Sequence, residues 1–126
     1  LLAQTEPELV SLCLDIGHHA YSGGDAVEFI RRHHQRIIHI HFKNIDAEVM
    51  RRVEAEGIHV GKAAALDAFC GPEEGAVDYE AVRDVLQEVD YSGFAIVEQD
   101  MFPAPFDKPL PIAQRSVAYL KKIGLA

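Results

Sequence analysis

The stretch RIIHIHFKN, residues 36–44, contains the pattern from which both a fold and a site are predicted. Apolar and titratable side chains alternate along it, with Ile38, Ile40 and Phe42 set between His39, His41 and Lys43. Strict alternation predicts a β-strand that turns one face to an apolar core. A row of two histidines and a lysine is unusual for a face that only meets solvent. We therefore predict that this row points into an enclosed site and helps to hold a metal ion.

Length and composition narrow the class of protein. The chain has 126 residues, 48% hydrophobic and 25% charged, which predicts one globular domain over residues 1–126. A net charge of −8 argues against a nucleic-acid partner, because an acidic surface repels phosphates. No apolar run reaches the roughly 20 residues that cross a bilayer, and no signal peptide is recognisable, so no membrane partner is expected. Cys13 and Cys70 form neither a disulfide framework nor a CxxC motif, as expected of a reduced, cytoplasmic protein.

Apolar runs alternate with amphipathic stretches along the chain. Asp25 is the expected N-cap of one helix, and Gly57 is the favoured stop of another. The stretch 58–77 is rich in Gly and Pro and is expected to be irregular. The predicted strands are 9–15, 37–42 and 92–100, and the predicted helices are 23–35, 46–57, one that begins at Asp78, and a last one whose apolar face holds Ala113, Val117 and Leu120.

The strand–helix order, repeated three times, indicates a parallel sheet covered by helices. Three such units leave both sheet edges open, and open edges invite further pairing. The chain also starts without Met, in a segment that reads as the middle of a helix. We therefore expect part of a larger α/β architecture, completed by an N-terminal portion of the chain or by a partner such as a second copy.

Each predicted strand ends near a side chain of a type that binds metals: Asp15, His41 and Glu98. Active sites of α/β barrels are built from the carboxyl ends of several strands, so these three are expected to converge. Two carboxylates and one imidazole suit Mn²⁺, Mg²⁺, Co²⁺ or Fe²⁺ and also hold Zn²⁺. Taken singly, an acid at a strand end often caps the next helix, and a histidine in a strand is often packed in the core. Their occurrence at three successive strand ends favours the metal site.

Three motifs, in this order, resemble the xylose-isomerase-like superfamily of TIM barrels, which includes sugar isomerases and epimerases. LDIGHHAYSGGD (14–25) is similar to its D-x-G-H segment, HIHFKN (39–44) to its H-x-H-x-K-D strand, and FAIVEQD (94–100) to its strand 8. VEAEG (53–57) and CGPEEGAVDY (70–79) make the longer pattern most similar to the inosose dehydratase family. The resemblance covers almost the whole chain, but only about the last three of the eight βα units of a TIM barrel.

The resemblance implies a fold and a site. The fold is that of an α/β protein: the C-terminal part of a TIM (β/α)8 barrel, with parallel strands and outer helices. Asp15, His41 and Glu98 would bind a divalent metal, Mn, Co, Mg or Zn, and the usual fourth ligand is a Glu on an earlier strand outside this chain. His18 would contact substrate hydroxyls, and Lys43 would bind a substrate oxygen. These two are the candidates for catalytic proton transfer.

Two positions depart from the family pattern. Asn44 stands where the H-x-H-x-K-D strand ends in Asp, which weakens an acid–base role at that position. GPEEG (71–75) carries an extra acidic pair relative to the short Gly-rich loop of the family, which bears on substrate fit.

The predicted function is that of a metal-dependent lyase that dehydrates a cyclic polyol ketone. In such a reaction the metal polarises the carbonyl and acidifies the adjacent C–H. A sugar isomerase or epimerase that uses the same enolisation is the first alternative, and a non-catalytic fragment or binding module is the second. An endonuclease-type relative is disfavoured by the charge of −8. The expected partner is a small polyol or sugar.

Overall fold

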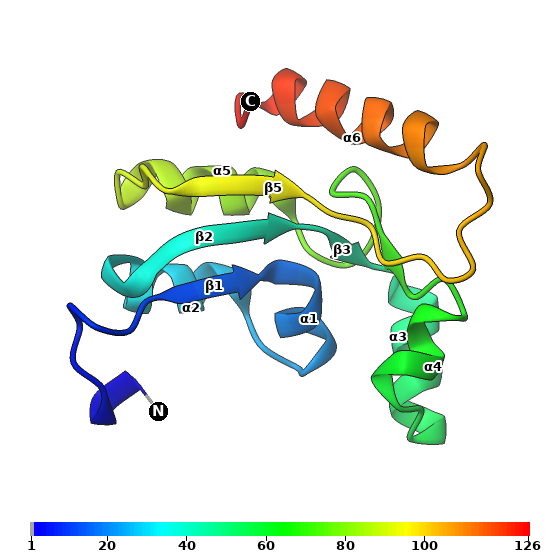
Figure 1. The fold of residues 1–126 in the computed structure, drawn as a ribbon, viewed down its shortest axis with the longest axis horizontal. Coiled ribbons are helices and arrows are strands. Elements are labelled where there is room, and N and C mark those ends of the chain that lie inside the picture. The colour runs from blue at the N-terminus through cyan, green and yellow to red at the C-terminus, as the bar shows by residue number, and fades with distance from the viewer. Residues whose placement is uncertain (1) are drawn as a thin grey trace.

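The computed structural model describes residues 2–126 and is built on a three-stranded parallel sheet (Figure 1). Its strands are β1 (Leu12–Asp15), β2 (Ile37–Phe42) and β5 (Phe94–Val97), in the order β1-β2-β5. All three run in the same direction, so their carboxyl ends meet at one edge of the sheet. The α/β class and the parallel strands are therefore as predicted, and within residues 2–126 the sheet is open at both edges.

The other elements alternate with these strands. They are η1 (Leu2–Gln4), α1 (Ile16–Tyr21), α2 (Ala26–His33), η2 (His34–Arg36), β3 (Asn44–Ile45), α3 (Ala47–Glu56), α4 (Val60–Ala64), β4 (Phe69–Cys70), α5 (Tyr79–Glu88) and α6 (Pro109–Ile123). Figure 1 shows α2 and α5 behind the sheet and α6 beyond β5. β3 and β4 pair antiparallel as a second, small sheet. Within residues 2–126, no helix has the length and apolarity needed to cross a membrane.

Aspartates start several helices by accepting hydrogen bonds from free amides of the first turn. The Asp25 side chain accepts from the Glu28 amide at the start of α2, as predicted. Asp46 and Asp78 do the same for α3 and α5. Gly57 ends α3 with a φ of 61°, a left-handed conformation that costs glycine little because it has no Cβ. Local sequence signals therefore set these helix bounds.

The hydrophobic core lies between the sheet and the helices behind it. Leu14, Ile40 and Phe42 point into it and are 6%, 0% and 3% exposed. Ile30 of α2 and Val82 of α5 belong to the same buried cluster. The alternation along β2 thus places Ile40 and Phe42 against helices and leaves His39 and His41 on the opposite face.

The opposite face of the sheet is largely uncovered. Phe94 is 77% exposed and Ile96 is 48% exposed, although alternation predicts that both lie inside a barrel. β1 and β5 are edge strands, each with a neighbour on one side only among the described residues. Exposed apolar side chains beside open strand edges are typical of a sheet that pairs with further structure.

Several details differ from the sequence-based expectations. The stretch 58–77 was expected to be irregular but contains α4 and β4. The sequence pattern did not indicate β4 because a strand of two residues is too short to show alternation. The predicted strands 9–15 and 92–100 are shortened to β1 and β5. Ile38 is 58% exposed and not covered by helices, because the β1–β2 register shifts there and Ile37 takes the buried position.

Tyr79 ties α5 to the end of β2, which gives a test of the packing. It is 1% exposed, its hydroxyl donates to the Lys43 carbonyl at 2.8 Å, and its ring packs edge-on against Phe42. Tyr79→Phe is expected to lower the free energy of unfolding by about 1–2 kcal/mol, because a buried carbonyl loses its donor. Urea denaturation measures this change. The control is Tyr119→Phe, whose hydroxyl has no hydrogen bond among residues 2–126, and equal losses in the two variants would contradict the assignment.

Candidate active site at the strand ends

Asp15, His41 and Glu98 lie together at the carboxyl ends of the three strands. Asp15 ends β1 and pairs with His41 of β2, and Glu98 follows β5 and donates its amide to the Phe42 carbonyl at 3.1 Å. One ligand atom from each of the three lies within 4.8 Å of the others. Nδ1 of His41 is 3.4 Å from Oδ2 of Asp15 and also contacts Oε2 of Glu98. The strand ends therefore present two carboxylates and one imidazole to a single point.

The two carboxylate oxygens of Asp15 have different partners. Oδ1 accepts a hydrogen bond from the His18 amide at 3.0 Å and caps α1. Oδ2 lies 3.0 Å from Nζ of Lys43 and faces His41. The helix-capping explanation is therefore correct for one oxygen, while the other oxygen remains directed into the site.

Lys43 places a buried ammonium among the carboxylates. Its side chain is 1% exposed, and Nζ lies 2.8 Å from Asp100, 3.0 Å from Asp15 and 3.1 Å from Glu98. Burial alone lowers the pKa of Lys43, but hydrogen bonds to these carboxylates outweigh burial and raise the pKa above its ordinary value. Three carboxylates around one ammonium leave a net charge of about −2, which favours a further cation beside them.

Asp100, which the sequence analysis missed, connects His18 to Lys43. Its Oδ2 lies 2.8 Å from Nε2 of His18 and 2.8 Å from Nζ of Lys43. Burial by itself raises the pKa of Asp100, but these two partners lower it below the ordinary value. The available signal was spacing, because Asp100 stands two residues after Glu98 and an extended chain turns such residues to the same side.

The imidazole of His18 is accessible and held on two sides. Its side chain is 46% exposed. Its ring stacks on the buried ring of Phe69, with centroids 4.6 Å apart and an angle of 12° between the planes. Phe69 belongs to β4, an element that the sequence analysis did not predict. The small sheet therefore supplies the platform that orients His18.

Gly17 and Asn44 support the site through close packing and hydrogen bonds. A Cβ on Gly17 would overlap Cγ of Lys43 and lie 3.3 Å from the Asn44 carbonyl oxygen. The Asn44 side chain is buried: its Oδ1 accepts from the amides of Ile45 and Val77, and its Nδ2 donates to the Val77 carbonyl. Asn44 thus fastens β3 to the segment before α5, which is a structural role.

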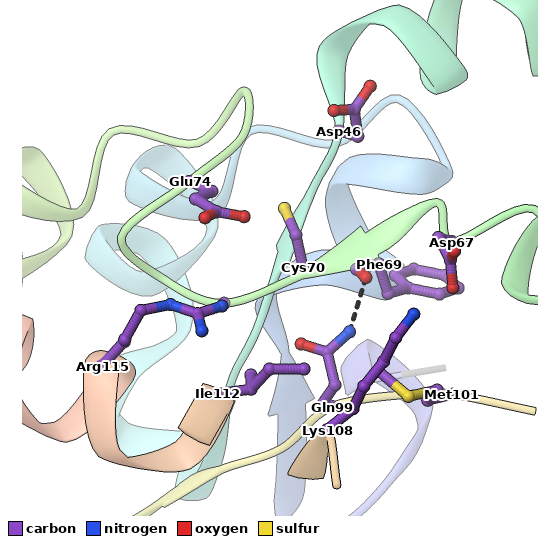
Figure 2. A pocket seen from close by; sticks show the side chains of 11 residues that line it. Asp46, Asp67, Phe69, Cys70, Glu74, Gln99, Met101, Lys108, Ile112 and Arg115 are labelled. Carbon is purple, nitrogen blue, oxygen red and sulfur yellow. Dashed lines mark hydrogen bonds between the residues drawn. The ribbon is translucent and has the colours of Figure 1, made fainter. Parts of the chain in front are cut away.

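A cavity of about 400 Å³ lies next to this site, between β4, the segment after β5 and the start of α6 (Figure 2). Gln99 reaches across it and donates to the Phe69 carbonyl at 2.6 Å. Cys70 lines it, and burial together with the nearby carboxylate of Glu74 raises the pKa of that thiol to about 12. The three predicted metal ligands do not line this cavity.

Parallel strands covered by helices, with carboxylates and imidazoles gathered at the carboxyl ends, define the α/β-barrel class of architecture. A family model described as a xylose isomerase-like TIM barrel matches residues 1–123. The chain belongs to this family. Both the fold class and the family resemblance predicted from the motifs are therefore confirmed.

Curated relatives that match the chain are inosose dehydratases. The chain is 34% identical over 122 residues to the protein of Clostridium botulinum (strain Eklund 17B / Type B), an alignment that covers 97% of this chain and 41% of the relative. It is 33% identical over 117 residues to the protein of Geobacillus thermodenitrificans, with 90% and 39% covered. It is 33% identical over 122 residues to that of Lactiplantibacillus plantarum, with 97% and 40% covered. The chain thus spans about 41% of the length of the curated relatives it matches.

Gly17→Ala tests the close approach of Lys43. The added methyl group would meet the buried Lys43 stem and the backbone of Asn44. We expect a loss of about 1–3 kcal/mol in the free energy of unfolding, as for other overpacked sites. The control is Gly61→Ala in α4, where the nearest atom to a new Cβ is 3.7 Å away and little loss is expected. Denaturant titration measures both, and two equal effects would contradict the interpretation.

Asp100→Asn tests the charge network through pH. Because folding lowers the pKa of Asp100, its carboxylate stabilises the fold above the ordinary value of 3.8, and this contribution is lost as the pH falls through the lowered pKa. Asp100→Asn is therefore expected to be less stable than the parent near neutral pH, with the difference shrinking below pH 3.8. Thermal unfolding across the pH range measures it. Asp107→Asn on the exposed loop before α6 is the control, and a pH-independent difference for Asp100→Asn would argue against the network.

Proposed function

We propose that this chain carries the metal-binding end of an enzyme that eliminates water from a cyclic polyol ketone. The observation that carries the proposal is the convergence of Asp15, His41 and Glu98 beside the His18–Asp100 pair. The name of the relatives, inosose dehydratase, supports this reaction over others open to the same fold. The substrate class is a small polyol or inosose, bound at the strand ends.

The donor set fits a divalent cation. Two carboxylates and an imidazole suit Mn²⁺, Co²⁺ or Mg²⁺ and also accept Zn²⁺. Their ligand atoms lie within 4.8 Å of one another, and ligands on one ion lie roughly 3–4 Å apart, so small side-chain rotations suffice. A bound cation would supply Lewis-acid chemistry, which polarises a substrate carbonyl and acidifies the neighbouring C–H. In the proposal a further carboxylate ligand comes from outside this chain, as the family pattern implies.

In this proposal Lys43 acts through charge and position. The family resemblance implies that Lys43 binds a substrate oxygen, but its side chain is 1% exposed and its Nζ donates a hydrogen bond to Asp100. Its ammonium orients Asp15 and Glu98, and it places a fixed positive charge beside the point where an enolate oxygen would develop. A preoriented charge of this kind stabilises a developing anion without reorganisation.

His18 is the group proposed to move the proton. Its side chain is 46% exposed. In the proposal, Nε2–H of His18 donates a hydrogen bond to Asp100, so that Nδ1 is the nitrogen that takes a proton from the substrate carbon. The imidazolium then gives the proton to the departing hydroxyl group. The C–H and C–O bonds break, a C=C bond forms and water leaves. Asp100 fixes the orientation of the ring, in the manner of carboxylate–histidine pairs in general acid–base catalysis.

Binding of Mn²⁺ tests the proposed ligands directly. Glu98→Gln and His41→Ala each remove one donor, so we expect at least ten-fold weaker Mn²⁺ binding, measured by electron paramagnetic resonance of the free ion. Glu54→Gln, on the exposed face of α3, is the matched carboxylate-to-amide control and should bind like the parent. Unchanged Mn²⁺ stoichiometry in both site variants would reject the ligand set.

Product analysis separates dehydration from the related enolisation reactions. With an inosose and Mn²⁺, the proposal expects loss of water and an absorbing dicarbonyl product. Conversion to an epimer or isomer without that absorbance would assign an isomerase or epimerase, because the proton then returns to carbon. Metal binding without turnover of either an inosose or a ketohexose, even in the full-length protein that contains the further ligand, would identify a non-catalytic module.

A further inference from the structure

A second group of donor atoms lies one layer below the strand ends, on the same face of the sheet. Cys13 of β1 pairs with His39 of β2, two residues before the pairing of Asp15 with His41. Alternation therefore stacks Cys13 under Asp15 and His39 under His41. One ligand atom each from Cys13, His39 and His41 lies within 4.8 Å of the other two. The two imidazole rings have centroids 5.4 Å apart and stand at 77° to each other.

A second observation concerns the side chain of His39. Its Nε2 atom is buried and has no hydrogen-bond partner among residues 2–126. A buried polar atom without a partner destabilises the fold, and a bound cation would offset this cost. Cys13 is exposed within residues 2–126.

The chemistry of these donors differs from that of the strand ends. A thiolate and two imidazoles are softer than carboxylates, and they favour Zn²⁺ or Cd²⁺ over Mn²⁺ or Mg²⁺. Three protein ligands and one water molecule form the usual open zinc site. Donors on a tetrahedral zinc ion lie about 3.5 Å apart, so the three side chains need to move inward by about an ångström or less. Binding would release the proton of the Cys13 thiol to solvent.

We propose that Cys13, His39 and His41 form a second cation site, selective for thiophilic ions, that shares His41 with the carboxylate site. Because His41 belongs to both groups, turning its ring toward one group withdraws a donor from the other. We call the group of Cys13, His39 and His41 the lower site, and the group of Asp15, His41 and Glu98 the upper site. A thiophilic ion bound at the lower site therefore weakens the binding of Mn²⁺ or Mg²⁺ at the upper site. The lower site does not depend on the proposed function. Only the competition between the two sites rests on the proposed function.

Cd²⁺ is the probe for the lower site, because a thiolate bound to Cd²⁺ absorbs in the near ultraviolet and carboxylates and imidazoles do not. The parent protein is expected to develop this absorbance with one equivalent of Cd²⁺. Cys13→Ser keeps the shape of the side chain. With one equivalent of Cd²⁺, its near-ultraviolet absorbance should be at least ten-fold lower than that of the parent, while its circular dichroism spectrum stays unchanged. His39→Gln should weaken the binding by at least ten-fold.

The matched control is Cys70→Ser, which removes the other free cysteine. Its thiol stays protonated, since its pKa is raised to about 12, and it lies outside the cluster. The absorbance should persist in this variant. Absorbance that survives in Cys13→Ser, or that disappears in Cys70→Ser, would overturn the assignment.

Competition with Mn²⁺ tests the shared histidine. In the parent, Cd²⁺ should release Mn²⁺ as the absorbance grows, whereas Cys13→Ser should need at least ten-fold more Cd²⁺ for the same release. Glu98→Gln should lose Mn²⁺ and keep the Cd²⁺ absorbance, so a failure of the upper site is distinguished from a failure of the lower one. Full Cd²⁺ absorbance with Mn²⁺ still bound would overturn the sharing of His41, and loss of the absorbance in Glu98→Gln would overturn the proposed donor set.

Discussion

The ion-pair network around the Lys43 ammonium is the constraint on which the rest of the site depends. A lysine that is 1% exposed needs compensating charge, and Asp15, Glu98 and Asp100 supply it from two other strand ends. The same contacts fix the carboxylates relative to His41 and, through Asp100, relative to His18. A single buried cation therefore determines where the candidate metal ligands and the candidate proton-transfer group lie.

On the face of the sheet that carries this network, the type of side chain changes with distance from the strand ends. Carboxylates dominate at the strand ends, a thiol and an imidazole lie one layer below, and Phe94 and Ile96 occupy the neighbouring strand. The gradient follows from register, because parallel pairing places residues of equal depth side by side. The carboxylate donors thus lie one layer above the thiol of Cys13 and the imidazole of His39. His41 belongs to both groups of donors.

Family membership and the open sheet agree with each other. The described residues form three parallel strands with two free edges and exposed apolar side chains on the inner face. The curated relatives are longer, and this chain spans about 41% of the one from Clostridium botulinum. A sheet of this kind gathers three candidate ligands at one edge but does not surround a substrate by itself.

Local patterns in the sequence determined the elements and their faces. The bounds of β2 follow from alternation at 37–42, the helix starts follow from aspartate caps, and the meeting of Asp15, His41 and Glu98 follows because parallel strands share one carboxyl edge. Tertiary structure alone decided the partners of the charges. Asp100 lies 57 residues from Lys43 and 82 from His18 along the chain, and no local periodicity links such positions. The burial of Lys43 and the β4 platform under His18 likewise arise only when distant segments pack.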